Sequence, residues 1–359
     1  MNGPSSNSPI KVLIADDSAF MRTALSRMVE SDGSLCVVGT AQTGPETLTQ
    51  IDQLQPDVIT LDIDMPGLTG LEVLKRVMSD SPRAIIMISS LAQAGAEATI
   101  EALSLGAFDC LAKRLNYGSM DIINVQDELV EKIKAAACSP QNARRRSRRV
   151  RRSPGPLGPP LALRTPAVVA VGVSTGGPKA LQDVLPALPA DLPVGLLIVQ
   201  HMPPGFTGPL AKRLDNLCHV HVQEAETGMV LTSGHVYLAP AGQHLTVRRS
   251  GSEVRLHLSS SPSGLAHIPS VDVMMQSVAE VFGAQAMGII LTGMGADGSL
   301  GMQTIFQAGG LTVGQDEATC AVYGMPRVCA EMGILRSVIP LPEVTGQILS
   351  ALGYRNPNW

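Results

Sequence analysis

A run of arginines followed by prolines and glycines, near the middle of the chain, constrains how the whole sequence can fold. Residues 139–165 hold eight Arg and no acidic residue. Because like charges repel and proline interrupts a helix, this segment is predicted to be an extended, solvated linker. It divides the 359 residues into two parts, each long enough for one domain at roughly 100–200 residues. We therefore expect a disordered N-terminus (1–9), a first domain (10–138), the linker (139–165) and a second domain (166–354).

The charge distribution limits the classes of partner. The linker could be a nucleic-acid arm, but it contains no aromatic residues, and both flanking regions are acidic. Residues 1–138 hold 10 basic and 18 acidic residues, and residues 166–359 hold 9 and 13. We therefore expect no nucleic-acid partner, and the linker is better explained as resting against its acidic neighbours.

Other sequence-wide features bear on the compartment. No apolar run reaches the ~18–20 residues of a membrane span, and residues 1–9 are polar, so we expect a cytoplasmic protein without membrane insertion. The six Cys lack C-x-x-C spacing, which argues against a zinc site or a disulfide framework.

The first domain alternates apolar runs with segments of helical periodicity. Apolar runs occupy 10–15, 35–39, 57–61, 84–88 and 109–112, and helical segments occupy 18–31, 45–54, 70–79, 95–105 and 121–137. Five such β-α units predict an α/β fold with a five-stranded parallel sheet covered on both faces. In this architecture a site forms beyond the carboxyl ends of the strands.

Polar residues follow four of these predicted strands. They are Asp16 and Asp17, then Asp62, then Ser89, and finally Lys113. Each Asp alone is explained as a helix cap or turn residue. Three carboxylates at one sheet edge, however, would repel one another without a cation, and an all-oxygen site suits Mg²⁺. An ion-bound carboxylate can accept a phosphoryl group, with the hydroxyl and the lysine contacting its oxygens.

The first domain resembles the response-regulator receiver family, through the loop at 61–67 (LDIDMPG) and the turn Gly106-Ala107. The resemblance implies a flavodoxin-like fold and phosphorylation at Asp62, with Ser89 and Lys113 contacting the phosphoryl group. The implied Mg²⁺ ligands are Asp16, Asp17, Asp62 and Asp64. Arg114 departs from the family, which usually has proline after the lysine.

A glycine-rich turn follows the first apolar strand of the second domain. Residues 168–173 run into the sequence GVSTGGP at 172–178, where Pro178 suits the first turn of a helix. A dinucleotide fingerprint would need glycine in place of Ser174, and a purely structural turn is a further explanation. The G-x-S-x-G match favours an exposed nucleophilic serine, Ser174, beside backbone N–H groups that could stabilise an oxyanion.

A nucleophilic serine needs a base and an orienting acid at the same sheet edge. The run 194–199 is followed by His201, and the run 286–291 leads into a glycine-rich loop whose acid is Asp297. His267 is a rival base. The order Ser, His, Asp differs from the orders of chymotrypsin, subtilisin and the α/β-hydrolases. The remaining histidines are expected on the surface: His219, His221, His235, His244 and His257.

These segments, together with PSVD at 269–272 and GMPR at 324–327, resemble the catalytic domain of the chemotaxis CheB methylesterase family. The resemblance implies a doubly wound, mostly parallel α/β domain in which Ser174 is the nucleophile, His201 the general base and Asp297 its orienting acid. It also implies that Thr175, His267 and the Met294 backbone support the site. Ala266 and Ile268 stand where relatives have arginine beside the histidine.

The resemblance implies a function as well. We expect a chemotaxis response regulator that releases methanol from glutamate methyl esters of chemoreceptors and deamidates receptor glutamines by Ser-His-Asp acyl transfer. Its phosphodonor would be a chemotaxis histidine kinase, Mg²⁺ would serve the receiver alone, and the protein would be a monomer. We further expect the unphosphorylated receiver to cover the Ser174 cleft and to open it on phosphorylation. The alternatives are a receiver-gated serine hydrolase for another ester or amide in a non-motility sensory system, and a DNA-binding output.

Overall fold

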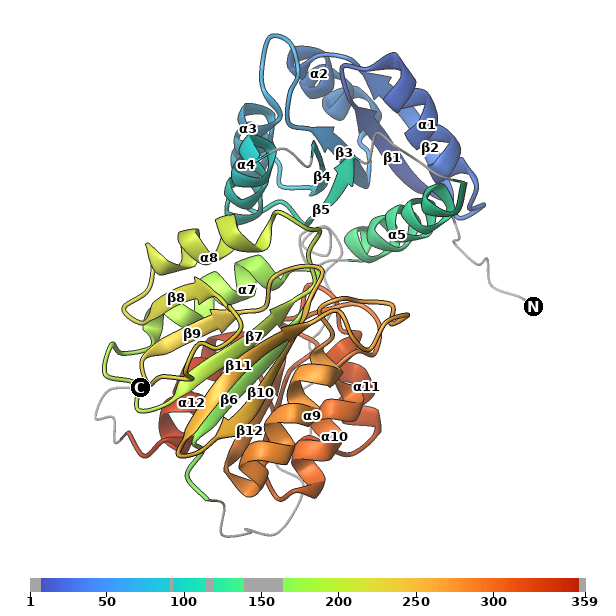
Figure 1. The fold of residues 1–359 in the computed structure, drawn as a ribbon. Coiled ribbons are helices and arrows are strands. Elements are labelled where there is room, and N and C mark those ends of the chain that lie inside the picture. The colour runs from blue at the N-terminus through green and yellow to red at the C-terminus, as the bar shows by residue number, and fades with distance from the viewer. Residues whose placement is uncertain (1–7, 91–92, 114–118, 139–163, 355–359) are drawn as a thin grey trace, which may run out of the picture. The chain divides into compact units, whose positions relative to one another are not determined.

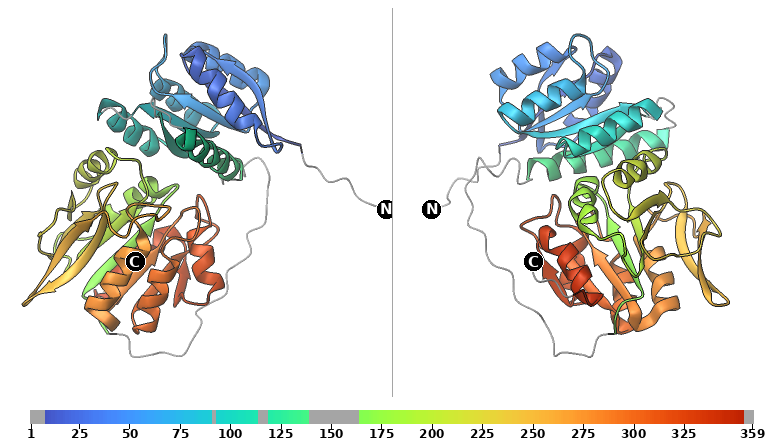
Figure 2. Two further views of the ribbon diagram at one scale, coloured as in Figure 1. Left: turned by 45° about the vertical axis from the view of Figure 1, so that its right-hand side comes forward. Right: turned by 90° about the vertical axis from the view of Figure 1, so that its left-hand side faces the viewer.

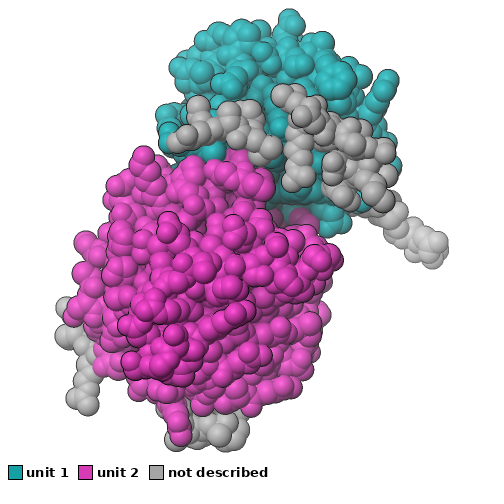
Figure 3. Space-filling model, in the orientation of Figure 1, with its two compact units in different colours: residues 1–149 teal, residues 150–359 magenta. Residues whose placement is uncertain are grey.

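The computed structural model describes residues 8–90, 93–113, 119–138 and 164–354. The chain divides into two compact units, residues 1–149 and 150–359 (Figure 3). Arg114, nearly all of the predicted linker and most of the predicted N-terminal segment lie outside the described residues, so the domain limits stay a prediction. Among the described residues, no helix is both long and apolar enough to span a bilayer.

The first unit is a five-stranded parallel sheet in the order β2-β1-β3-β4-β5, with helices on both faces (Figure 1). Its elements are β1 (Ile10–Ala15), α1 (Ala19–Glu30), β2 (Leu35–Ala41), α2 (Gly44–Leu54), β3 (Val58–Asp62), α3 (Gly70–Asp80), β4 (Ala84–Ser90), α4 (Gln93–Ser104), β5 (Asp109–Lys113) and α5 (Ser119–Ala137). This order confirms the predicted receiver fold. It makes β1 and β3 neighbours, so the residues that follow them share one sheet edge.

The second unit is a seven-stranded parallel sheet in the order β14-β13-β12-β6-β7-β9-β8, with an antiparallel hairpin β10-β11 beside it. Its strands are β6 (Val168–Val173), β7 (Gly195–Gln200), β8 (His221–Glu224), β9 (His235–Leu238), β10 (His244–Ser250), β11 (Glu253–Ser259), β12 (Ala286–Ile290), β13 (Leu311–Gln315) and β14 (Ser337–Ile339). Its helices are α7 (Gly177–Val184), α8 (Thr207–Asp215), α9 (Val271–Phe282), α10 (Ser299–Gln307), α11 (Met325–Glu331) and α12 (Val344–Ala351), with 3₁₀ turns at Leu185–Ala187, Gly283–Gln285 and Leu341–Glu343.

The central strand β6 marks the point where the strand order reverses. Along the chain, the sheet first grows from β6 through β7 and then returns to add β12 on the other side of β6. Loops after these three strands diverge toward opposite faces, and such a switch point is where open α/β sheets bind ligands. The doubly wound fold is therefore confirmed.

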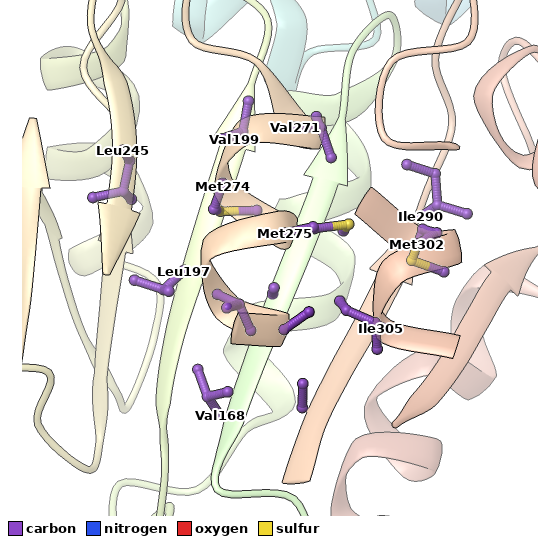
Figure 4. Close-up of a cluster of buried hydrophobic side chains, with 14 of the residues drawn as sticks. Val168, Leu197, Val199, Leu245, Val271, Met274, Met275, Ile290, Met302 and Ile305 are labelled. Atoms are coloured by element: carbon purple, nitrogen blue, oxygen red, sulfur yellow. The ribbon is translucent and has the colours of Figure 1, made fainter. Parts of the chain in front are cut away.

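The helices α9 and α10 cover one face of this sheet, and α7 and α12 cover the other (Figures 1 and 2). The core beneath α9 is aliphatic and methionine-rich, with Met274, Met275 and Met302 fully buried against strand residues such as Val168 and Leu197 (Figure 4). The α9 layer approaches β6 closely. A Cβ atom on Gly172 would lie 2.3 Å from a methyl carbon of Val271.

Candidate active site

The turn after β6 presents Ser174 at the carboxyl edge of the sheet. The Ser174 N–H donates to the Thr292 carbonyl at 3.0 Å, and the Ser174 carbonyl accepts from the Gly177 N–H at 2.8 Å. Gly176 has a φ of +77°, a conformation that glycine adopts without steric cost, and α7 begins at the next residue. The chain therefore turns sharply from strand to helix, with Ser174 half-buried at the turn.

His201 lies beside this serine because of strand register. Val173 of β6 pairs with Gln200 of β7, so Ser174 and His201 follow paired positions on neighbouring parallel strands. The His201 N–H also donates to the Val173 carbonyl at 3.1 Å. The imidazole is only 7% exposed, which shields it from bulk water.

The Asp297 carboxylate contacts the imidazole of His201. Oδ2 of Asp297 lies 2.8 Å from Nε2 of His201 and accepts from the Val271 N–H at 2.7 Å, while Oδ1 accepts from the Ser270 hydroxyl at 2.8 Å and the Asp272 N–H at 3.0 Å. Burial opposes ionisation, but these hydrogen bonds and the nearby imidazole hold the pKa of Asp297 well below its usual range. Asp297 is therefore an ionised acceptor at the N-terminus of α9.

The orientation of the imidazole determines which nitrogen can act as a base. An ionised carboxylate only accepts hydrogen bonds, so Nε2 of His201 carries the proton in this contact. Within the described residues, Nδ1 of His201 is buried and has no hydrogen-bond partner. The Nε2–H tautomer leaves the lone pair on Nδ1, which is the nitrogen available to take a proton.

Two further predicted residues lie against this group. The ring of His267 stacks on the ring of His201, with centroids 4.1 Å apart and planes at 18°. His267 itself is exposed and Thr175 is buried. The Thr175 carbonyl accepts from the hydroxyl of Thr292 at 2.9 Å, which ties the residue after the serine to the loop after β12.

The loop that carries Met294 approaches the serine closely. A Cβ on Gly293 would lie 2.8 Å from the Cβ of Ser174, and a Cβ on Gly324 would lie 3.1 Å from the Cα of Met294. The backbone at 293–294 is therefore confined between the serine turn and the residues before α11. Only glycine permits this approach, which brings the Gly293 backbone beside Ser174; the role of the neighbouring Met294 backbone stays a prediction.

Buried amide and hydroxyl side chains that were not predicted from the sequence lie beneath the site. The side-chain amide of Gln200 donates to the carbonyls of both Ser174 and His201, at 2.9 Å each. The side-chain carbonyl of Gln315 accepts from the Thr292 N–H at 2.8 Å. All these side chains are at most 2% exposed. The sequence signal that could have identified them is a polar residue at the end of a buried strand, since Gln200 ends β7 and Gln315 ends β13.

The expectation that His244 is a surface residue is wrong. His244 is fully buried, and its Nδ1 accepts from the Ser270 N–H at 3.1 Å while its Nε2 lies 3.0 Å from the Pro262 carbonyl. The alternation of β10 turns its side chain inward, toward the residue that caps α9. His244 thus supports Ser270, which in turn hydrogen-bonds to Asp297.

The carboxyl edge of the first unit gathers three carboxylates around a lysine. Oxygens of Asp16, Asp17 and Asp62 lie within 4.8 Å of one another. Nζ of Lys113 lies 2.8 Å from Oδ2 of Asp16 and 2.7 Å from Oδ2 of Asp62. Burial raises the pKa of Asp62 to about 6, and the lysine counteracts part of that rise.

The remaining predicted receiver residues occupy different positions. The hydroxyl of Ser89 is buried and donates to the Gly95 carbonyl at 3.1 Å. Asp64 is exposed and is not among the three gathered carboxylates. The carboxylate oxygens of this cluster are hard ligands of the kind that Mg²⁺ prefers. Of the two aspartates after β1, Asp16 is buried and Asp17 is exposed, which suits an ion that keeps part of its water shell.

The first unit is a phosphoacceptor module. The second is an α/β domain with a serine, a histidine and an aspartate at its switch point. Together they define a class of protein, the receiver-linked serine hydrolases. The response regulator receiver domain model matches residues 12–122, and the CheB methylesterase model matches residues 169–348. The chain belongs to the CheB methylesterase family and carries a receiver domain.

Individual relatives are similar along nearly their whole length. A protein-glutamate methylesterase/protein-glutamine glutaminase 2 of Nitratidesulfovibrio vulgaris is 43% identical, over 96% of this chain and 99% of that protein. A protein of the same enzyme name from Symbiobacterium thermophilum is 45% identical, over 96% and 98%. The crystal structure of the Thermotoga maritima CheB methylesterase catalytic domain is 36% identical with a TM-score of 0.51, and it covers 52% of this chain and 99% of that chain.

Proposed function

We propose that this protein hydrolyses methyl esters of glutamate side chains on chemoreceptors, releasing methanol, and deamidates receptor glutamines to glutamate. Family membership and the names of its relatives support the reaction class. The observation that carries the proposal is the 2.8 Å contact between His201 and Asp297, on the strand edge next to Ser174. This contact leaves one imidazole nitrogen free to serve as a base.

In the first step, Oγ of Ser174 attacks the γ-carbonyl carbon of the ester, and Nδ1 of His201 takes the hydroxyl proton. The imidazolium that forms is stabilised by Asp297. Backbone N–H groups of the serine turn and the Met294 loop would stabilise the developing oxyanion; the Ser174 N–H is not one of them, because it donates to the Thr292 carbonyl. The carbon–oxygen bond to the methoxy group then breaks, and Nδ1 returns the proton so that methanol leaves.

In the second step, water attacks the acyl carbon on Ser174 and Nδ1 of His201 takes a proton from that water. The bond to Oγ breaks, the serine regains its proton and the substrate leaves as glutamate. A glutamine side chain follows the same course, with ammonia as the first leaving group.

We propose that the first unit regulates this activity through phosphorylation of Asp62 by a chemotaxis histidine kinase. Asp16, Asp17 and Asp62, with Asp64 as the further predicted ligand, would hold Mg²⁺. When bound, the ion would neutralise charge on the phosphoryl oxygens. Lys113 already lies 2.7 Å from Asp62 and would contact those oxygens after transfer, as would Ser89. The cytoplasm and a monomeric state remain parts of this proposal.

The direct test is methanol release from membranes that contain methylated receptors, with and without acetyl phosphate and Mg²⁺. We expect release by the wild type, an increase with the phosphodonor, and none above background by Ser174→Ala. Ser233→Ala is the matched control, since Ser233 is exposed and precedes β9 at the opposite end of the sheet. Full methanol release by Ser174→Ala would overturn the assignment of the nucleophile.

The same assay distinguishes receptor methylesterase activity from the alternative, a serine hydrolase that acts on another ester or amide. A chain that hydrolyses a small activated ester through Ser174 but leaves receptor methyl esters intact would be a serine hydrolase for another substrate. Ammonia release from unmethylated, glutamine-bearing receptors tests the deamidase activity independently.

A further inference from the structure

The residues before α10 and the residues that begin α9 cap each other's helix. Asp297 precedes α10, yet its carboxylate accepts the N–H groups of Val271 and Asp272 at the start of α9. Asp272, in the first turn of α9, accepts the Gly301 N–H of α10 at 2.8 Å. Each carboxylate therefore binds the positive end of the other helix, where free N–H groups need acceptors.

The two helices pack so closely here that this arrangement has little freedom. A Cβ on Gly301 would lie 2.5 Å from the Cβ of Met275 and 3.2 Å from the Cα of Asp272. A Cβ on Gly298, which has a φ of +97°, would lie 2.8 Å from a methyl carbon of Val271. The start of α10 therefore lies directly against the first turns of α9.

The environment of Asp272 is that of an internal acceptor. Burial raises its pKa to about 6, the amides of Gly301, Gly298 and Leu300 oppose that rise, and the charge on Asp297 adds to it. The groups that favour the ionised form of Asp272 are thus the backbone amides at the start of α10. No contact of Asp272 with His201 or Ser174 is observed among the described residues, so any effect on the reaction must pass through Asp297.

We propose that Asp272 is a positioning residue for Asp297: it holds the first turn of α10 and so fixes the loop that presents Oδ2 of Asp297 to Nε2 of His201. Asp297 lies four residues before Gly301, so a shift of that turn moves the carboxylate directly. An aspartate displaced by a fraction of an ångström orients the imidazole poorly. Asp272 contacts neither His201 nor Ser174 among the described residues, so we expect its loss to change kcat rather than KM.

The test compares Asp272→Asn, Asp272→Ala and the control Glu343→Gln in the full-length protein. Glu343 is an exposed carboxylate at the start of α12, so the control also removes one negative charge at a helix N-terminus. We expect kcat for methanol release to fall about 10- to 100-fold in Asp272→Asn and further in Asp272→Ala, with KM unchanged. Glu343→Gln should match the wild type.

The kcat measurement depends on the proposed enzymatic activity, so a second measurement, by ¹H NMR, is made independently of it. The proton between Nε2 of His201 and Asp297 should give a downfield ¹H NMR signal in the wild type that moves or broadens in Asp272→Asn and not in Glu343→Gln. If the wild type releases no methanol, the proposed function fails and the NMR signal still tests Asp272. An Asp272→Asn protein with the kcat of the wild type and an unmoved NMR signal would overturn the proposal. An Asp272→Asn protein that no longer unfolds cooperatively would also overturn it, since Asp272 would then serve the fold.

Discussion

The ring of His267 stacks on the ring of His201, with centroids 4.1 Å apart and planes at 18°. His267 is exposed, while the His201 side chain is only 7% exposed. The outer ring therefore covers one face of the inner ring and limits its rotation. Asp297 fixes the inner ring at one edge, and His267 fixes it from above.

This stack predicts a modest role for the outer imidazole. His267→Ala should lower kcat by at most about tenfold, because a stacked pair contributes about 0.5–1.5 kcal/mol. His267→Phe should restore most of the loss, since it keeps the flat face without an ionisable nitrogen. The measurement is steady-state methanol release by both variants. Loss of all activity in His267→Phe would instead make His267 a base.

Gln200 is expected to contribute to both stability and catalysis. Gln200→Leu removes the donor that the Ser174 and His201 carbonyls share. The Ser174 carbonyl keeps the Gly177 N–H as a donor, so the main loss is at the His201 carbonyl, and a buried carbonyl left unpaired costs about 1–3 kcal/mol. We expect a lower thermal midpoint for the second unit and a reduced kcat. Gln223→Leu, on the edge strand β8, is the control for loss of an amide. An unchanged midpoint in Gln200→Leu would contradict the hydrogen-bonding role.

Gly293 should tolerate no side chain. A Cβ at this position would lie 2.3 Å from Sδ of Met325 and 2.8 Å from the Cβ of Ser174. Gly293→Ala should therefore displace the Met294 loop and lower kcat about 10- to 100-fold. Gly346→Ala is the matched control, because a Cβ there meets no atom within 4 Å and lies in helix α12. Equal activity of the two variants would show that the approach of this loop is unimportant.

Phosphorylation of the first unit should act through Asp62 alone. Asp62→Asn should keep basal esterase activity but lose the increase that acetyl phosphate and Mg²⁺ give the wild type. Chelating Mg²⁺ should abolish that increase in the wild type without lowering basal activity, since the ester reaction uses the serine, the histidine and the aspartate. A variant still activated by the phosphodonor would require another phosphoacceptor.

Asp272 should make stability depend on pH. Its pKa is raised to about 6 by burial, so the folded state holds its proton more tightly than the unfolded chain does. The resulting stabilisation is present below about pH 4 and is lost as pH rises through about 6, a change of about 1–3 kcal/mol. Asp297 stays ionised over this range, and burial keeps the Cys329 thiol neutral by raising its pKa to about 12.

Urea unfolding of the full chain at pH 4.5 and pH 7.5 checks this prediction through the transition of the second unit. Asp272→Asn lacks the titration, so its stability relative to the wild type should increase between the two pH values. A relative stability that is constant or decreases would contradict a raised pKa. A relative stability that rises with pH, together with a lower kcat at pH 7.5, is characteristic of a charge kept for function.

The sequence alone determined the class of each unit and the edge on which its site lies. Parallel strands end at one edge of a sheet, so Ser174, His201 and Asp297 could be placed on one edge from strand patterns. The choice of His201 over His267 as the base came from the family resemblance. The same argument gathered Asp16, Asp62 and Lys113. Asp64 was placed by resemblance, and the structure leaves it outside the carboxylate cluster.

Only the tertiary structure decided how the site is held. The bonds from Ser270 to Asp297 and from Thr292 to Thr175 join residues 27 and 117 positions apart, and local periodicity carries no information about such pairs. The burial of His244 and the reciprocal capping by Asp272 and Asp297 depend on how α9 packs against β10 and α10. The reacting groups follow from strand order, whereas their orientation follows from contacts that exist only after the layers have packed.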